Sequence, residues 1–337
     1  MLSITVKSIR FPLLSQLRDI LITTIKETEI NMVNKLPPDK IVIRPPVESY
    51  SVLIPVTGGC SWSSKTGGCK FCGTYNSGVY GGIQEYAVRD IEDVKNDIDY
   101  YAQKNYKGMP VFLAGGNPTS TDTDYLAEVV QYTKEHLRPE RISCYAKALD
   151  ILRKSDEELE RLADAGLDIV YMGLESGSSK ILRIMRKGTN AESMINAGKR
   201  ILKAGIELSL YIILGLGGKK YSEDHVKGTA RVLTAINPTI FRFRTLHVIP
   251  GTPLYEWVQE GKFELLSPLE NVKEERDIIA NLGENVDSTV YNDHISNYCN
   301  IQTENIKKDR ERFLTTLNQM IKDPKLKNLP RKQLTRM

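Results

Sequence analysis

Three of the five cysteines in this chain lie close together in a glycine-rich stretch. Cys60, Cys69 and Cys72 fall within "GGCSWSSKTGGCKFC", a C-x8-C-x2-C spacing. Cysteine thiolates bind zinc and iron–sulfur clusters, and each of these groups normally takes four ligands. The sequence holds no second CxxC pair to complete a structural zinc site. The open question is therefore what supplies the fourth ligand.

The two remaining cysteines are poor candidates for that ligand. Cys144 lies in an apolar run, where a lone cysteine is usually a small hydrophobic residue. Cys299 lies far along the chain, near His294, and would reach the cluster only by a long fold-back. Three thiols leave one iron of a four-iron cluster open to another molecule. We therefore favour an iron–sulfur cluster, with structural zinc as the alternative.

Composition indicates an ordinary globular protein. The 337 residues carry 46 Lys and Arg against 42 Asp and Glu, a net charge of +4, which by itself indicates no nucleic-acid partner. The apolar run "FPLLSQLRDILITTI" is interrupted by Arg18 and Asp19, so it fits neither a signal peptide nor a membrane span. We predict a cytoplasmic protein with reduced thiols and no membrane span.

The cysteines need elements that hold them, and six short apolar runs predict β-strands. Amphipathic segments with helix caps, such as 155–166 and 190–205, lie between the runs. Alternating strands and helices imply parallel strands with right-handed crossovers, and six units are fewer than the eight of a closed barrel. The sequence thus predicts an α/β fold, a partial, open (β/α)6 barrel. The predicted strands are residues 51–57, 110–115, 141–146, 168–174, 207–214 and 239–248.

Three regions follow from this pattern. Residues 1–49 are predicted to form an N-terminal extension, a helix and a Pro-rich connector, which is too short for a Rossmann-type domain. Residues 50–262 contain the predicted barrel. Residues 263–337 are polar, mostly helical, and form a C-terminal extension that is a candidate lid or substrate-binding region.

Cys60 directly follows the first predicted strand, and sites in parallel α/β folds gather at that end of the strands. On this placement the chain resembles radical S-adenosylmethionine enzymes, with a first spacing longer than the usual three residues. Longer first spacings occur in related branches such as the Elongator catalytic subunit and some phosphinate methyltransferases. The branch that the chain resembles is the coproporphyrinogen-oxidase-like and Elongator-catalytic-subunit-like branch. The resemblance implies that Cys60, Cys69 and Cys72 hold a 4Fe-4S cluster whose open iron binds S-adenosylmethionine. It also implies that Phe71 lies beside the adenine.

A second motif, "LAGGNPTS", resembles the family's Gly-Gly-Glu-Pro stretch, which lines the methionine amino group. The resemblance assigns Gly115, Gly116, Asn117 and Pro118 to this role, although Asn117 replaces the common Glu. Glycines would let a ligand approach the backbone closely, and proline stiffens the turn. A plain turn explains the string equally simply.

Two further stretches also resemble the family. In "YMGLESGSSKILRIMRKGT", Glu175 matches a residue at the ribose or methionine end, and Arg186 and Lys187 fall near the position that binds the methionine carboxylate. "LYIILGLGG" resembles the segment that contacts adenine, which assigns Ile213 and Gly215 to it. Each assignment has a simpler alternative. Glu175 could be a helix cap or part of a surface ion pair, and Arg186 and Lys187 could be solvated charges. The stretch "LYIILGLGG" could be a buried strand followed by a glycine turn.

The chain has four histidines, and two of them are candidate catalytic groups. His247, in "LHVIPGTPLYE", and His294, in "HISNY", are the candidates, although a lone histidine is more often structural. His136 is predicted to be a solvated charge at a helix end, and His225, in "SEDH", to be exposed on the surface.

The resemblance implies an enzyme that cleaves S-adenosylmethionine reductively with a single 4Fe-4S cluster. The resulting 5′-deoxyadenosyl radical would act on an unidentified substrate, and an electron donor such as flavodoxin or ferredoxin would reduce the cluster. Two alternatives remain open. One is a tRNA-modifying radical enzyme, suggested by the Elongator-like spacing and the basic tail. The other is a non-catalytic zinc-binding or interaction protein.

Overall fold

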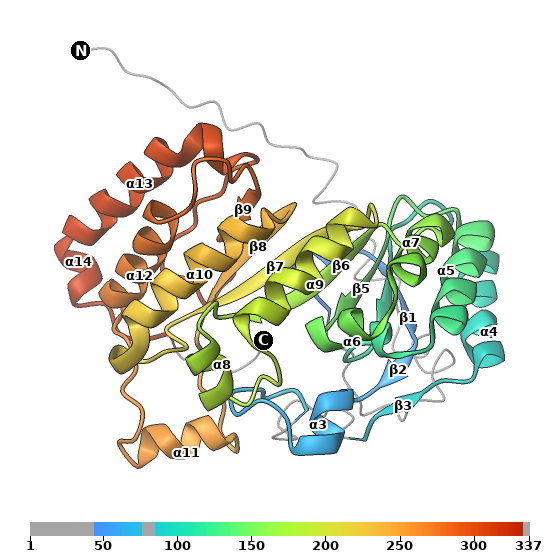
Figure 1. Cartoon of the computed structure of the whole chain (residues 1–337), viewed down its shortest axis with the longest axis horizontal. Coiled ribbons are helices and arrows are strands. Elements are labelled where there is room, and N and C mark those ends of the chain that lie inside the picture. Colours follow the sequence, from blue (N-terminus) through green and yellow to red (C-terminus); the bar gives the residue numbers. More distant parts are fainter. Residues whose placement is uncertain (1–43, 76–84, 333–337) are drawn as a thin grey trace. The chain divides into compact units, whose positions relative to one another are not determined.

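A computed structural model of the chain describes residues 44–75 and 85–332 (Figure 1). These residues belong to one compact unit, Ile41–Met337. The helix and most of the connector predicted for residues 1–49 lie outside the described residues. Within the described part of the chain, no helix is long and apolar enough to cross a membrane.

A seven-stranded sheet of parallel strands forms the centre of the fold, in the order β1-β4-β5-β6-β7-β8-β9. All six predicted strands are present, and the described strands β1 and β9 do not pair with each other, so the open barrel is confirmed. The short strands β2 and β3 form a separate antiparallel pair. The bounds are β1 Val52–Pro55, β2 Thr57–Gly58, β3 Ala87–Val88, β4 Val111–Ala114, β5 Ile142–Ala146, β6 Ile169–Glu175, β7 Glu207–Leu214, β8 Ile240–Thr245 and β9 Thr289–Tyr291.

Helices follow the strands where the amphipathic segments predict them. The capping box of Ser155 and Glu158 begins α7, and Gly166, with a φ of 111°, ends it. Asn190 caps α9 by accepting a bond from the Ser193 amide. The helices of this part are α3 Ser61–Thr66, α4 Ile91–Gln103, α5 Thr123–Leu137, α6 Ala148–Arg153, α7 Asp156–Ala165, α8 Ser179–Ile184, α9 Ala191–Lys203 and α10 Ser222–Ile236, with 3-10 turns η1 Pro46–Glu48, η2 Pro118–Ser120 and η3 Lys219–Tyr221.

The C-terminal region lies beside the β8 and β9 edge of the sheet, whereas α4 and α5 lie at the β1 edge (Figure 1). Helix α11 Pro253–Gln259 precedes this region, whose own helices are α12 Pro268–Ala280, α13 Ile306–Lys322 and α14 Pro324–Lys327. Helix α12 packs on α10, and α13 packs on α12. Phe313 and Leu317 of α13 are fully buried in the same hydrophobic core as the outward faces of the strands. The extension is therefore part of the main core.

A buried carboxylate closes the amino-terminal end of the strands. Glu48 is completely buried and forms an ion pair with Arg141, 2.8 Å away. Its carboxylate also accepts hydrogen bonds from the hydroxyls of Ser51, Ser143 and Tyr171. This network occupies the barrel at the amino-terminal ends of the strands. The barrel is therefore accessible from the carboxyl ends of the strands.

Candidate active site

A cavity of about 300 Å³ lies at the carboxyl ends of the strands. The chain segments that line it come from the cysteine loop, from the ends of β5 to β8, and from the segment after β9. Ten of the predicted site residues line this cavity, namely Cys60, Cys69, Phe71, Cys72, Gly116, Glu175, Lys187, Ile213, His247 and His294. Residues separated by more than 200 positions thus meet in one place.

The cysteine loop is fixed by bonds to the turn after α8. The Lys70 amide donates to the Met185 carbonyl at 3.0 Å, and the Trp62 indole donates to the Arg186 carbonyl at 2.8 Å. Within the loop, the Cys72 amide donates to the Cys69 carbonyl at 3.0 Å. These bonds hold the segment from α3 onward against the turn after α8.

All three thiols face the cavity without forming disulfides. Burial raises the pKa of the Cys69 thiol to about 12 and also raises the pKa of Cys72. Bound metal favours the thiolate, so these groups would lose their protons on binding iron. Among the described residues, no three His, Cys, Asp or Glu side chains are grouped closely enough to hold a single metal ion.

Glu175 and Lys187 form the most buried ion pair that lines the cavity. The Lys187 Nζ lies 2.7 Å from the Glu175 Oε1, and both side chains are less than a fifth exposed. Burial alone would lower the pKa of Lys187, but the negative charges of Glu175 and Cys69 outweigh it, so the pKa is raised. A Cβ on Gly173 would lie 2.1 Å from the Glu175 Oε1, so a side chain at this position would displace the ion pair.

The two glycines of "LAGGNPTS" contact the cysteine loop. A Cβ on Gly115 would lie 2.1 Å from the Thr57 hydroxyl, and one on Gly116 would lie 2.1 Å from the Gly59 carbonyl oxygen. The Gly116 amide also donates to that carbonyl at 3.0 Å. The glycines therefore allow β4 to approach the cysteine loop, and only Gly116 of this motif reaches the cavity lining.

Asn117 is completely buried behind the cavity and positions the loop. Its Oδ1 accepts a bond from the Ser61 amide at 3.1 Å, and its Nδ2 donates to the Ser61 hydroxyl at 2.7 Å and to Asp150 at 2.6 Å. Ser61 begins α3 directly after Cys60. An amide suits this position because it both accepts and donates, whereas a carboxylate would face Asp150.

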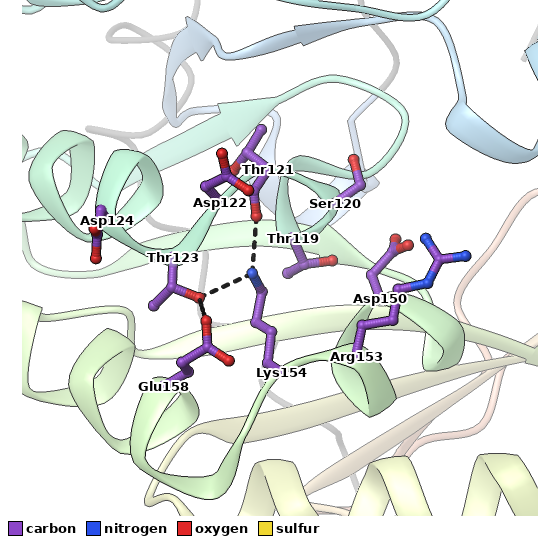
Figure 2. Close-up of a pocket in the computed structure, with 10 residues that line it drawn as sticks. All are labelled: Thr119, Ser120, Thr121, Asp122, Thr123, Asp124, Asp150, Arg153, Lys154 and Glu158. Carbon is purple, nitrogen blue, oxygen red and sulfur yellow. Dashed lines mark hydrogen bonds between the residues drawn. The ribbon is translucent and has the colours of Figure 1, made fainter.

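A polar pocket of about 290 Å³ lies on the far side of this motif (Figure 2). Lys154 points into its centre, and its Nζ donates to the Thr121 carbonyl at 2.8 Å and to the Thr123 hydroxyl at 3.1 Å. Thr123 in turn donates to Glu158 at 2.7 Å. These bonds connect the turn containing Pro118 to α6 and α7, and they stabilise the turn on the side away from the cavity.

The structure places the other predicted cofactor residues in two groups. Phe71 and Ile213 line the cavity and pack in one apolar cluster with Leu246. Gly215 lies outside the lining and donates its amide to Glu274 at 2.5 Å. Arg186 also lies outside it, and its carbonyl receives the Trp62 bond.

The surroundings of two histidines differ from those predicted. His225 was predicted to be exposed but is completely buried, with its Nδ1 2.8 Å from the Ser176 hydroxyl. Burial lowers the pKa of His225 to about 3. The polar string around it hides that this face of α10 turns toward the end of β6. His136 lies 2.7 Å from Asp99 and stacks on Tyr132.

The sequence reasoning missed several side chains that line the cavity. Arg244 lies at the end of β8, and Tyr145, Tyr171 and Tyr211 come from β5, β6 and β7. In "TIFRFRT" the arginines alternate with phenylalanines, so a period of two already separates an inward polar face from an outward apolar face. Lys147, directly after β5, also lines the cavity.

The fold and site define an α/β-barrel protein whose cavity lies where such enzymes place their active sites. Residues 54–233 match the family model of the Radical SAM superfamily, and the chain belongs to that family. The family predicted from the motifs is thus confirmed, and its members are enzymes that use a 4Fe-4S cluster and S-adenosylmethionine.

Relatives of the chain include proteins of different roles. The uncharacterized protein MJ0486 of Methanocaldococcus jannaschii is 25% identical over 221 residues, covering 64% of this chain and 67% of that protein. The heme chaperone HemW of Bacillus subtilis is 25% identical over 186 residues, covering 54% of this chain and 48% of HemW. The crystal structure of methylornithine synthase (PylB) aligns with a TM-score of 0.49 and 16% identity, covering 89% of this chain and 82% of PylB. This chain thus spans about half the length of HemW.

Proposed function

We propose that this protein is a radical S-adenosylmethionine enzyme with a single 4Fe-4S cluster held by Cys60, Cys69 and Cys72. The observation that carries the proposal is that these three thiols line one cavity together with the Glu175 and Lys187 pair. Thiols, an ion pair and an apolar wall are the groups that a thiolate-bound cluster and an amino-acid-bearing nucleoside would contact.

Each part of the cavity has a proposed role. The Lys187 ammonium is suited to the methionine carboxylate, and the Glu175 carboxylate to the amino or ribose end. Phe71 and Ile213 offer apolar surface for the adenine. Asn117 and the glycines before it hold the cysteine loop in place. Residues 50–262 would carry the cofactors, and residues 263–337 would complete the substrate wall through His294 and Ser296.

When bound, the cofactor pair supplies one-electron reductive cleavage of S-adenosylmethionine to a 5′-deoxyadenosyl radical that abstracts hydrogen from the substrate. The residues of this chain bind and orient the reactants and exclude water from the cavity. A small reductant protein such as flavodoxin or ferredoxin would deliver the electron.

The experiment is anaerobic reconstitution followed by measurement of iron, sulfide and 5′-deoxyadenosine. Replacing Cys60, Cys69 and Cys72 together by Ala should abolish iron and sulfide binding and 5′-deoxyadenosine formation. The matched controls are Cys144→Ala and Cys299→Ala, which remove buried thiols outside the cavity and should retain the cluster. Loss of the cluster in Cys299→Ala would show a fourth protein ligand, and zinc without sulfide in the wild type would refute the proposal.

A further inference from the structure

Two of the three positive charges in the cavity form no ion pair with the described residues. Three cationic side chains line it, and Lys187 is paired with Glu175. Lys147 lies beside the cysteine loop, with its Nζ 3.4 Å from the Ser61 hydroxyl. Arg244 forms no ion pair with any described residue, and its Nε is buried without a hydrogen-bond partner. A buried guanidinium nitrogen without an acceptor is costly, so the site favours an anionic group.

The surroundings of Arg244 also supply hydrogen-bond donors. The Arg244 guanidinium lies over the Tyr211 ring, 4.8 Å from its centroid, and the Tyr211 hydroxyl is buried without a partner. Burial raises the pKa of Tyr211, so the hydroxyl stays protonated at neutral pH. A protonated hydroxyl beside a guanidinium can donate to the same anion.

His294 is a third donor that lines the cavity. The Ser296 amide donates to the His294 Nδ1 at 3.2 Å, which assigns the ring proton to Nε2. Burial lowers the pKa of His294 to about 4, so the ring is neutral at pH 7. Ser296 is held in turn by the Thr245 amide, which donates to its hydroxyl at 3.1 Å. The segment after β9 is thereby fixed to the end of β8.

Aromatic rings cover the floor of this part of the cavity. Tyr145 and Tyr171 lie edge to face, 6.3 Å apart, and Tyr211 lies at the same distance on the other side of Tyr171. No carboxylate of the described residues other than Glu175 lines the cavity. The region away from the cysteines thus combines donors for an oxyanion with apolar ring surface.

We propose that the substrate carries a carboxylate or phosphate group that binds Arg244, with Tyr211 and His294 as further donors, and an apolar body that packs on the tyrosines. This inference rests on the proposed function because it assigns the substrate side of the same cavity. A guanidinium can form two parallel bonds to a carboxylate or phosphate, which a lysine cannot reproduce.

The test uses reconstituted full-length protein saturated with S-adenosylmethionine, and three small probes. Benzoate carries a carboxylate on a ring, phenyl phosphate carries a phosphate, and benzamide is the neutral counterpart. Titrations by calorimetry give the affinities in the wild type, Arg244→Gln, Arg244→Lys and Tyr211→Phe. Arg231→Gln is the control, because it removes an exposed arginine that pairs with Glu192.

We expect at least one anion to bind tenfold or more tightly than benzamide, and Arg244→Gln to weaken that binding at least tenfold. Arg244→Lys should give an intermediate loss, Tyr211→Phe a smaller one, and Arg231→Gln none. The anion that binds more tightly shows whether the substrate group at Arg244 is a carboxylate or a phosphate. Equal binding of benzamide and both anions, or unchanged affinity in Arg244→Gln, would overturn the inference.

Two measurements keep the outcomes separate. Thermal unfolding shows whether Arg244→Gln is folded. If it is not, the anion affinities of Tyr211→Phe and Arg244→Lys test the inference in its place. Cluster content and 5′-deoxyadenosine formation in the wild type test the proposed function independently. Anion binding without a cluster would refute that function while supporting an anion site, and a functional cluster without anion binding would refute only this inference.

Discussion

The ammonium of Lys187 lies 2.7 Å from the carboxylate of Glu175, although helix α8 separates the two residues in the chain. Their ion pair closes the segment around α8 onto the end of β6. The turn that ends this helix also accepts the Lys70 amide through the Met185 carbonyl. The ion pair and the cysteine loop are therefore parts of one structure, and changes in either should affect the other.

Lys187→Met should weaken S-adenosylmethionine binding at least tenfold. It removes a charged donor and leaves the buried Glu175 without its partner, and a hydrogen bond to a charged group contributes about 1.5 to 3 kcal/mol. Lys180→Met is the control, because Lys180 pairs with Asp224 on the surface at 3.3 Å. Titration of reconstituted protein measures both affinities, and equal affinity in the two variants would contradict the assignment of Lys187.

Asn117→Asp should lower cluster content while S-adenosylmethionine contacts remain in place. The new carboxylate would face Asp150, now 2.6 Å from the Asn117 Nδ2, and the like charges would push α3 and the cysteine loop away. Iron and sulfide per protein after reconstitution is the measurement. Asn281→Asp, at an exposed helix end, serves as the control. Wild-type iron content in Asn117→Asp would show that the loop is held by its other bonds.

Local patterns predicted the strands, caps and cysteine placement because these depend on neighbours in the sequence. All six predicted strands exist, and Ser155 and Asn190 cap the helices that they precede. The carboxyl ends of parallel strands meet at one edge, so residues at those ends converge even when they are distant in sequence. This explains why Cys60 and Glu175 could be assigned to one cavity.

Contacts between distant segments were not predictable in this way. Strand β9 has three residues, too short for a periodic pattern, and joins the sheet only because it pairs with β8. In the sequence Arg244 cannot be distinguished from other charged residues. Only the structure shows that its Nε is buried without a hydrogen-bond partner. Truncation near Leu266 would not test a lid, because it would remove β9 and buried residues such as Phe313. Point substitutions at the cavity are therefore the better test.

His225→Gln should reduce the loss of stability on acidification. The pKa of His225 is lowered to about 3 by burial, whereas in the unfolded chain it lies near 6.5. Between these values the unfolded chain binds a proton that the native protein does not, so native stability falls as pH decreases. At pH 5 this costs the wild type about 2 kcal/mol.

The pH experiment compares unfolding of the wild type and His225→Gln at pH 7 and pH 5. Burial raises the pKa of Glu274 to about 7, so its uptake of a proton in the native state stabilises the fold as pH falls. Since the Glu274 carboxylate lies 3.8 Å from the His225 Nε2, the same comparison in a Glu274→Gln background separates the contribution of the histidine from that of Glu274. His136→Gln, at a partly exposed ion pair, is the control. An equal shift in all three proteins would mean that His225 is accessible to protons in the native state.

Glu48→Ala should destabilise the fold by about 3 to 5 kcal/mol, because it leaves Arg141 and the hydroxyl of Tyr171 without their acceptor. Glu128→Ala, which removes an exposed carboxylate paired with Lys95, should cost less than about 1 kcal/mol. Urea unfolding of the cluster-free protein measures both changes. Glu48→Gln keeps an acceptor oxygen, so its loss of unfolding free energy should fall between those of the two alanine variants.

Since Tyr171 also lines the cavity, Glu48→Ala should in addition weaken binding of the anionic probes, whereas an equally destabilised variant of the outer core should not. A Glu48→Ala protein as stable as Glu128→Ala would show that the base of the barrel tolerates the loss of this network.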